Sequence, residues 1–483
     1  MTCQLTGVAV LFNSLDYVCR VALSIVLLAT VGYAASDPAQ FPTAAHTSQM
    51  WQQWMDRGYQ LERQGEYAEA TLSFRNAVAS SDRVQQPERL AQSQAELAKL
   101  LFLRSEYVES ESLFARAIAG LEALPGQPHL APALANSALF YSRRGQVDKA
   151  EQLCRRALDL QLRTQPRDDL GIAASSSVLA QIELNRGHYA EAESVSRQEL
   201  AVREKLTGSD ELGLAVNLNN LGAVRFVLGH LDEAESFYRR SLSILENSVG
   251  REHPEAARAR YHLAEIYSAQ GQYRKAEDLL IGVTEIWKSA LGPEHADLAL
   301  VYVQLATVYY RESRFDEAAV LLQHGLAICE KALPADDPQT ATTLNDLAVV
   351  RRAKHQYKNA ESLYLRALSM EERTLGPGHL AVSRTLNNLA ETYYAERRYR
   401  EAEPLYLRSL RLTEQVLGPT HPEFANVLSN YALLLRKMHR KQDAQKLGAR
   451  IRALHTMSHS YDRERLQIDW RELQTPHKMS RAF

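Results

Sequence analysis

Cysteine is scarce in this chain, and its few cysteines are not placed for a shared role. The 483 residues contain four, at positions 3, 19, 154 and 329. Cys154 and Cys329 lie 175 residues apart, and no CxxC pair occurs. The spacing therefore indicates neither a zinc cluster nor a disulfide framework.

An excess of one charge is also lacking. The chain has 56 Lys and Arg against 58 Asp and Glu, a formal net charge of −2. Proteins that bind nucleic acid or anionic membrane surfaces usually carry a clear basic excess. We therefore expect neither nucleic acid nor an anionic membrane surface as a partner.

The short motifs of common enzymes and cofactor sites are missing. The sequence contains no GxGxxG, GxxxxGK[ST], HExxH or GxSxG, the patterns that hold phosphates, catalytic metals and nucleophiles. We therefore predict that the protein is not an enzyme and has no cofactor or metal.

One apolar run, Val21–Val31, stands near the start of the chain and follows Arg20. Small residues at 32 and 34 follow it, the layout of a secretory signal peptide cleaved after Ala34. We expect residues 1–34 to direct export to the periplasm or the medium, and residues 35–50 to form a linker. The alternative is an uncleaved membrane anchor at residues 21–35, the one case in which a membrane would be a partner.

The rest of the chain repeats itself. A small residue ends a recurring unit at Ala70, Ser110, Ala150, Ala192, Ala234, Ala276, Ala318, Ala360, Ala402 and Ala444, at intervals of 40, 40 and then 42 seven times. A period in this range indicates an array of supersecondary units that stack on one another.

Each period reads as two helices. Within residues 211–252, apolar residues recur at helical spacing from Leu214, Gly229-His230 breaks the pattern, and a second helix begins at Leu231 with acidic residues in its first turn. Strand patterns are absent. A second small residue, twelve positions before the first, lets the two helices pack closely.

This arrangement resembles the tetratricopeptide repeat, whose marked positions hold Trp54, Gly58, Ala70, Phe74 and Ala77 in the first unit. The 42-residue period is similar to that of kinesin light chains. The resemblance covers residues 51–455. It implies an all-α protein, an α-solenoid in which about ten repeats form a right-handed superhelix. Residues 456–483 form a C-terminal tail in which Leu466, Trp470 and Leu473 could line a capping helix.

A ladder of polar residues marks the first helix of the repeats, two positions before its small residue. Nine of its ten members are polar: Asp56, Glu96, Asn136, Val178, Asn220, His262, Gln304, Asp346, Asn388 and Asn430. Asn and Asp are poor residues for a helix interior because they compete for backbone hydrogen bonds. The resemblance implies that this position faces a concave groove, where an Asn amide can bond both sides of a peptide unit.

Further candidates for the groove are Asn219, Asn345 and Asn387, one position earlier, together with Arg258 and Arg384. The alternative is that the ladder bonds neighbouring repeats to one another, because either arrangement satisfies an amide.

Four histidines, His253, His295, His379 and His421, recur before the first helix of their units, with Asp337 at the same position in the unit between them. Stacked repeats hold equivalent residues roughly 10 Å apart, too far for zinc ligands, which lie about 2 Å from the metal. We expect these residues to cap the helix or to pack at its start. Cys154 takes a position held elsewhere by Phe or Tyr, so we expect it to be buried and unreactive.

Together these features predict a scaffold that binds an extended peptide or partner protein along the groove, as a monomer or weak oligomer. The alternative is a structural protein that assembles through its terminal repeats.

Overall fold

The computed structural model describes residues 44–83, 86–164, 168–206, 210–419 and 421–461. The predicted signal peptide or anchor, most of the predicted linker, and the stripe of Leu466, Trp470 and Leu473 lie outside these residues. None of the described helices is long and apolar enough to cross a membrane.

The described residues are helical and contain no strand, which confirms the predicted fold class. A short 3₁₀ turn follows α9. The helices are α2(Ala44–Arg63), α3(Tyr67–Arg83), α4(Pro87–Leu103), α5(Tyr107–Glu122), α6(Leu130–Arg143), α7(Val147–Arg163), α8(Asp169–Arg186), α9(Tyr189–Arg203), α10(Glu211–Val227), α11(Leu231–Ser248), α12(Pro254–Ala269), α13(Tyr273–Leu291), α14(Ala296–Arg311), α15(Phe315–Ala332), α16(Pro338–Ala353), α17(Tyr357–Thr374), α18(Leu380–Ala395), α19(Tyr399–Leu417), α20(Pro422–Lys437) and α21(Lys441–Tyr461).

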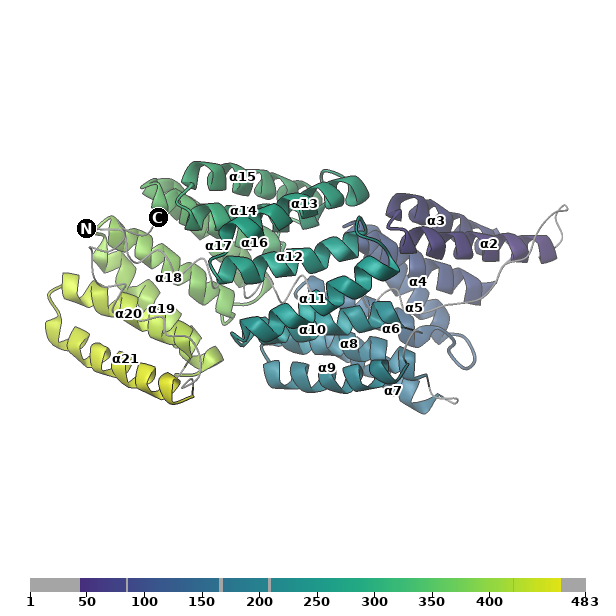
Figure 1. The fold of residues 1–483 in the computed structure, drawn as a ribbon, viewed down its shortest axis with the longest axis horizontal. Helices are drawn as coiled ribbons and strands as arrows, with labels where there is room; N and C mark the ends of the chain where they lie inside the picture. Colours follow the sequence, from purple (N-terminus) through teal and green to yellow (C-terminus); the bar gives the residue numbers. More distant parts are fainter. Residues whose placement is uncertain (1–43, 84–85, 165–167, 207–209, 420, 462–483) are drawn as a thin grey trace. The chain divides into compact units, whose positions relative to one another are not determined.

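Consecutive helices pair side by side, beginning with α2 and α3 and ending with α20 and α21 (Figure 1). Each pair is one repeat, numbered 1 to 10 along the chain; its first helix is called helix A and its second helix B. The array extends beyond its expected limits at both ends. Helix α2 begins at Ala44, inside the predicted linker, and α21 continues to Tyr461, past residue 455.

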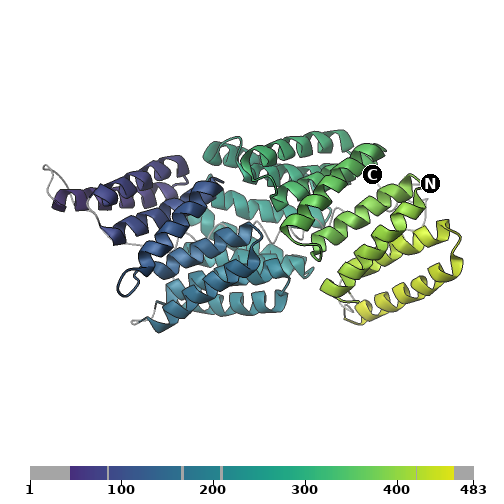
Figure 2. The same ribbon diagram turned by 180° about the vertical axis from the view of Figure 1, so that it is seen from behind.

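The chain divides into two compact units. Of the described residues, those up to 340 form the first unit, with helices α2 to α15, and those from 341 form the second, with most of α16 and helices α17 to α21. Figure 2 shows the same helix pairs from the opposite side.

Small residues on helix A allow the close packing expected from the sequence. A Cβ atom added to Gly58 would lie 2.6 Å from the ring of Phe74 on helix B, and one added to Gly222 would lie 2.8 Å from the ring of Tyr238. A contact this short would force the ring to shift, so in repeats 1 and 5 the aromatic ring lies closer to helix A than an alanine at this position would allow. Cys154 is fully buried as predicted, and burial raises the pKa of its thiol to about 12.

The turn between helix A and helix B has one geometry throughout. A residue with positive φ stands five positions before the recurring small residue of helix B in every repeat. Five of the ten are glycines, and the others are Ser105, Ser313, His355, Arg397 and His439. Glycine adopts this conformation without the steric cost that other residues incur, so the turn geometry, rather than the residue, is constant.

Candidate functional site

The predicted ladder on helix A is buried in repeats 4 to 9 and half-buried in repeats 1 to 3 and 10, and in the second unit its amides connect one repeat to the next. The Nδ2 atom of Asn388 donates to Oδ1 of Asn345, in the preceding repeat, at 3.1 Å. Asn430 donates to Oδ1 of Asn387 at 3.1 Å and to Glu391 at 2.7 Å. These amides therefore hold repeats 8, 9 and 10 together.

In the first unit the ladder has fewer partners. Asn220 donates to the backbone carbonyl of Ser177 at 3.4 Å, a long contact with repeat 4. Gln304 is 4% exposed on α14, and Asn136 is half-buried on α6. Within the described residues, the ladder asparagines of repeats 9 and 10 therefore form shorter hydrogen bonds to neighbouring repeats than Asn220 of repeat 5 does.

His262 on α12 belongs to a buried acid–imidazole pair. Its Nδ1 lies 2.9 Å from Oε2 of Glu265, and its ring stacks on Tyr238 with centroids 4.8 Å apart. Burial raises the pKa of Glu265 well above its usual range, while burial and the charge of Arg258 lower the pKa of His262 to about 3. Burial therefore favours the neutral form of both groups, a carboxylic acid that donates to the imidazole.

A group of polar atoms on α8, α10 and α12 has no hydrogen-bond partner among the described residues. Their side chains are at most 2% exposed. The atoms are both amide atoms of Gln181 and of Asn219, Oδ1 of Asn220, Nε2 of His262 and Oε1 of Glu265. An unsatisfied buried polar group costs about 1–3 kcal/mol, so repeats 4 to 6 carry polar groups that only water or a bound molecule can satisfy.

Arg258 and Arg384, the predicted basic groove residues, form ion pairs with the following repeat. Arg258 on α12 lies 3.0 Å from Asp297 on α14, and Arg384 on α18 lies 2.8 Å from Glu423 on α20. Each pair spans 39 residues, and every side chain involved is 10% exposed or less. Within the described residues, these two arginines thus form ion pairs that connect neighbouring repeats.

The recurring histidines cap helices, as predicted. His253, His295, His379 and His421 are the N-cap residues of α12, α14, α18 and α20. In each, Nδ1 accepts a hydrogen bond from the backbone N–H two residues later, at 3.1–3.2 Å. Asp337 accepts the corresponding bond from Gln339 at 2.8 Å. Among the described residues, no cluster of His, Cys, Asp and Glu could hold a metal ion.

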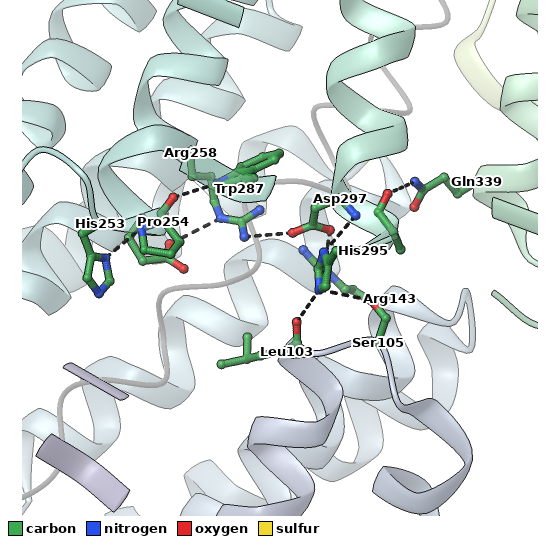
Figure 3. A network of polar contacts seen from close by, with 12 residues as sticks. Leu103, Ser105, Arg143, His253, Pro254, Arg258, Trp287, His295, Asp297 and Gln339 are labelled. Carbon is green, nitrogen blue, oxygen red and sulfur yellow. Dashed lines mark hydrogen bonds and ion pairs between the residues drawn. The ribbon is translucent and has the colours of Figure 1, made fainter. Parts of the chain in front are cut away.

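Two of these caps also contact repeats far away in the sequence, which the sequence did not predict. In the first unit, Nε2 of His295 lies 2.8 Å from the carbonyl oxygen of Leu103 and 3.4 Å from Oγ of Ser105 (Figure 3). A Cβ atom on Gly65 would lie 2.9 Å from Cδ of Pro254, the residue after the His253 cap. The starts of helix A in repeats 6 and 7 therefore lie against the helix A–helix B turns of repeats 1 and 2.

A third contact of the same kind, also within the first unit, joins the turn of repeat 3 to the residues just before α16. Arg144 lies 2.8 Å from Asp337, and Arg143 lies 3.8 Å from Asp297. Tyr107 packs on the start of α14 and on Leu333. We call this set of contacts the seam: residues 63–67, 103–107 and 143–144 on one side, and 253–255, 295–297 and 337–339 on the other.

The seam joins the turn of one repeat to the residues that start helix A five repeats later, and the Arg143–Asp297 pair adds a contact across four repeats. The three contacts occupy equivalent positions of the repeat, although the turns recur every 40 residues and the caps every 42. Nothing in the sequence gives the offset of five repeats, which depends on how far each repeat rotates from the last. A search for complementary residues at separations near 192 would have found the Arg144–Asp337 pair.

Comparison with known proteins supports the repeat assignment. The model of the tetratricopeptide repeat family matches residues 129–205, 213–281, 262–331, 339–414 and 382–456, well over half of the chain. Comparison with curated proteins gave no match.

Several solved structures are similar to parts of the chain. A putative kinesin light chain of Podosopora anserina with nearly identical TPR-like repeats is 26% identical, covers 43% of this chain and 98% of its own, and has a TM-score of 0.37. BtubC of P. vanneervenii is 24% identical, with 48% and 91% covered and a TM-score of 0.38. Aspartyl phosphate phosphatase F of Bacillus subtilis is 15% identical, with 68% and 94% covered and a TM-score of 0.40.

The repeated helix pairs, their period and the family match lead to one conclusion: the chain belongs to the tetratricopeptide repeat family.

Proposed function

We propose that the protein is an interaction scaffold that binds an extended segment of a partner protein along the helix A face of repeats 4 to 6. The observation that carries this proposal is the group of unpartnered polar atoms on α8, α10 and α12. A protein of this family without a bound partner offers such a face to a peptide, and the atoms include both donors and acceptors.

The chemistry of these atoms fits a peptide backbone. The amides of Gln181 and Asn219 each supply one acceptor oxygen and an NH₂ donor, which match the N–H and C=O of a peptide unit. Nε2 of the neutral His262 adds a donor. Side chains of the partner would then be selected by the residues around these amides, as in other cases of extended-peptide recognition.

Burial of these atoms sets a condition on binding. Gln181 and Asn219 are each 1% exposed, so a partner reaches them only if neighbouring helices separate slightly. Binding then includes the free-energy cost of this opening. The apparent affinity is the affinity of the open form multiplied by the fraction of molecules that are open.

Selection from a displayed library of linear random peptides tests the proposal without a known partner. Peptides selected on the full chain are measured against a Gln181→Ala, Asn219→Ala double variant by fluorescence anisotropy. Loss of two amides should weaken binding by about tenfold or more, since each hydrogen bond contributes about 1 kcal/mol, while circular dichroism remains unchanged.

The control is Asn76→Ala, which removes the same type of side chain from an exposed position on helix B of repeat 1. It should leave affinity unchanged. Equal affinity of all three proteins would place the binding surface elsewhere and would contradict the proposal.

Export remains a separate proposal that rests on residues 1–34 alone. Fractionation of native cells tests it: recovery of the chain in the cytoplasm, with its first residues intact, would contradict it.

A further inference from the structure

Helix B carries a recurring arginine on its outer side, six positions after the recurring small residue. It is present in six of the ten repeats, as Arg116, Arg156, Arg240, Arg366, Arg408 and Arg450. In four of them the guanidinium pairs with a glutamate at the end of the preceding helix B: Arg156 with Glu122, Arg240 with Glu204, Arg408 with Glu372, and Arg450 with Glu414, at 2.5–2.9 Å.

Repeat 6 has glycine at this position. Gly282 lies inside α13, where glycine is about 1 kcal/mol less favourable than alanine. A Cβ atom added there would meet no other atom within 4 Å. The glycine is therefore not required by packing, and it leaves open the space that an arginine side chain fills in other repeats.

The glutamate that would receive this arginine is engaged by others. Glu246, at the end of α11, lies 2.7 Å from Arg260 and 3.5 Å from Arg251. Between repeats 5 and 6, the usual arginine–glutamate pair that joins two helices B is thus absent among the described residues. Glu246 pairs instead with Arg251 of the α11–α12 loop and with Arg260 of α12.

The open space is part of a cavity of about 790 Å³. Three segments of the first unit line it: Gln64–Glu66 in the turn of repeat 1, Val249–Pro254 before α12, and the face of α13 that carries Gly282. This volume is within the range of about 300–1,000 Å³ that is usual for ligand sites.

The charges that line the cavity favour a cation. Its carboxylates are Glu66, Glu252, Asp278 and Glu285, and none of the four forms an ion pair with a described residue. Its two arginines, Arg251 and Arg260, both contact Glu246. Asp278 and Glu285 stand four positions before and three after Gly282, so they lie on the same face of α13 as the gap.

One buried group also forms part of the cavity wall. His253 is 3% exposed, its Nδ1 accepts a hydrogen bond from the backbone N–H of Glu255, and its Nε2, which carries the proton in the neutral ring, faces the carbonyls of Glu62 and Arg63. This imidazole is therefore part of the wall, and the carboxylates are the groups that can hold a cation.

We propose that this cavity binds an arginine side chain of a partner polypeptide, which takes the place of the arginine that repeat 6 lacks. The guanidinium would contact Asp278 and Glu285, and its planar fork suits carboxylates better than the ammonium of lysine. This site lies apart from the helix A amides of Gln181 and Asn219, so the inference goes beyond the proposed function.

Binding of a fluorescein-labelled tetra-arginine peptide to the full chain, followed by anisotropy at low ionic strength, tests the proposal. Wild type should bind it, and should bind tetra-lysine more weakly. Gly282→Arg supplies the guanidinium from the chain itself and should weaken tetra-arginine binding by about tenfold. Gly282→Ala leaves the space open and should change affinity by less than about twofold.

A pair of charge variants separates a specific site from general attraction to acidic side chains. Asp278→Asn with Glu285→Gln should weaken binding by about tenfold, whereas Glu191→Gln with Asp232→Asn, which removes two exposed carboxylates from other helices B, should not. Absence of tetra-arginine binding, equal binding by Gly282→Arg and wild type, or equal loss in both charge variants would overturn the proposal.

Discussion

At the scale of single residues, the polar side chains of helix A fall into two groups that differ in their partners. Asn388 and Asn430 donate to the preceding repeat, so they contribute to stacking. Gln181 and Asn219 have no hydrogen-bond partner within the part of the chain that the structure describes. A buried amide without a partner destabilises the chain on its own, so the second group is the better candidate for binding.

The neutral pair of His262 and Glu265 gives the first prediction. Burial raises the pKa of Glu265, so the folded chain keeps a proton that the unfolded chain loses above its ordinary pKa, about 4.3. Its contribution to stability is therefore full below that pH and decreases as the pH rises toward the folded pKa. Glutamine imitates the protonated acid at every pH.

Glu265→Gln should therefore match wild type in thermal unfolding near pH 4 and exceed it at pH 8, by about 1 kcal/mol for each unit by which the pKa is raised. Circular dichroism at both values checks this. If the difference between the two proteins did not depend on pH, Glu265 would not be protonated in the folded state.

The positions of these residues could be predicted from the sequence, but their partners could not. The period places Asn220, Asn388 and Asn430 at one position of the repeat. Asn388 forms a hydrogen bond with an amide of the preceding repeat, whereas Asn219 has no hydrogen-bond partner among the described residues. The difference depends on which residues of the adjacent repeat stand 39 and 43 positions away in the sequence.

At the scale of elements, the helix pair and its caps follow directly from local chemistry. The break at Gly229-His230, the start of α11 at Leu231 and the histidine caps were all predicted, because turn and cap preferences act within a few residues. The first and last described helices extend past the limits expected for the array. Helix α2 begins seven residues before residue 51 because residues 44–50 carry no residue that stops a helix.

The ion pair between Arg384 and Glu423 gives a prediction at this scale. Both side chains are 10% exposed or less, so removing one leaves a buried charge, which costs roughly 3–5 kcal/mol. Arg384→Met alone should therefore lower the free energy of unfolding by about this amount, and Arg384→Met with Glu423→Met should recover most of it. Denaturant unfolding of the full chain measures both.

The exposed pair of Arg408 and Glu372, each 34% exposed, serves as the control. Arg408→Met should cost less than about 1 kcal/mol. A loss at Arg384 as small as that at Arg408, or no recovery in the double variant, would show that the buried pair does not hold repeats 9 and 10 together.

At the scale of the whole molecule, the seam is the feature that repetition alone does not determine. Its contacts join residues about 190 apart within the first unit, such as Leu103 with His295 and Arg144 with Asp337. Their formation depends on the summed rotation of five repeats, and a small change in each step would separate them. The sequence therefore predicted the caps but not what they contact.

The seam should weaken in acid. Burial is the main cause that lowers the pKa of His295, and Arg143 of α6 and Arg258 of α12 act in the same direction, against Asp297 and the carbonyl of Leu103. Because the pKa of His295 is lowered in the folded chain, its contribution to the stability of the seam is full above the ordinary histidine pKa of about 6.5. That contribution is lost as the pH falls below this value.

Hydrogen–deuterium exchange of the turn between α4 and α5 should therefore accelerate between pH 7 and 5, after correction for the intrinsic rate. His295→Asn keeps a good capping residue and should remove this dependence, whereas His421→Asn, at the same position in the second unit, should not. Identical pH profiles for wild type and His295→Asn would contradict the assignment.

The central claim is that the helix A face of repeats 4 to 6 receives a partner segment. The most direct test is photo-cross-linking of a library-selected peptide that carries a photoreactive group, with the attachment points mapped by mass spectrometry. We predict attachment to α8, α10 and α12, and its loss in the Gln181→Ala, Asn219→Ala variant. Attachment confined to helices B, unchanged in that variant, would contradict the claim.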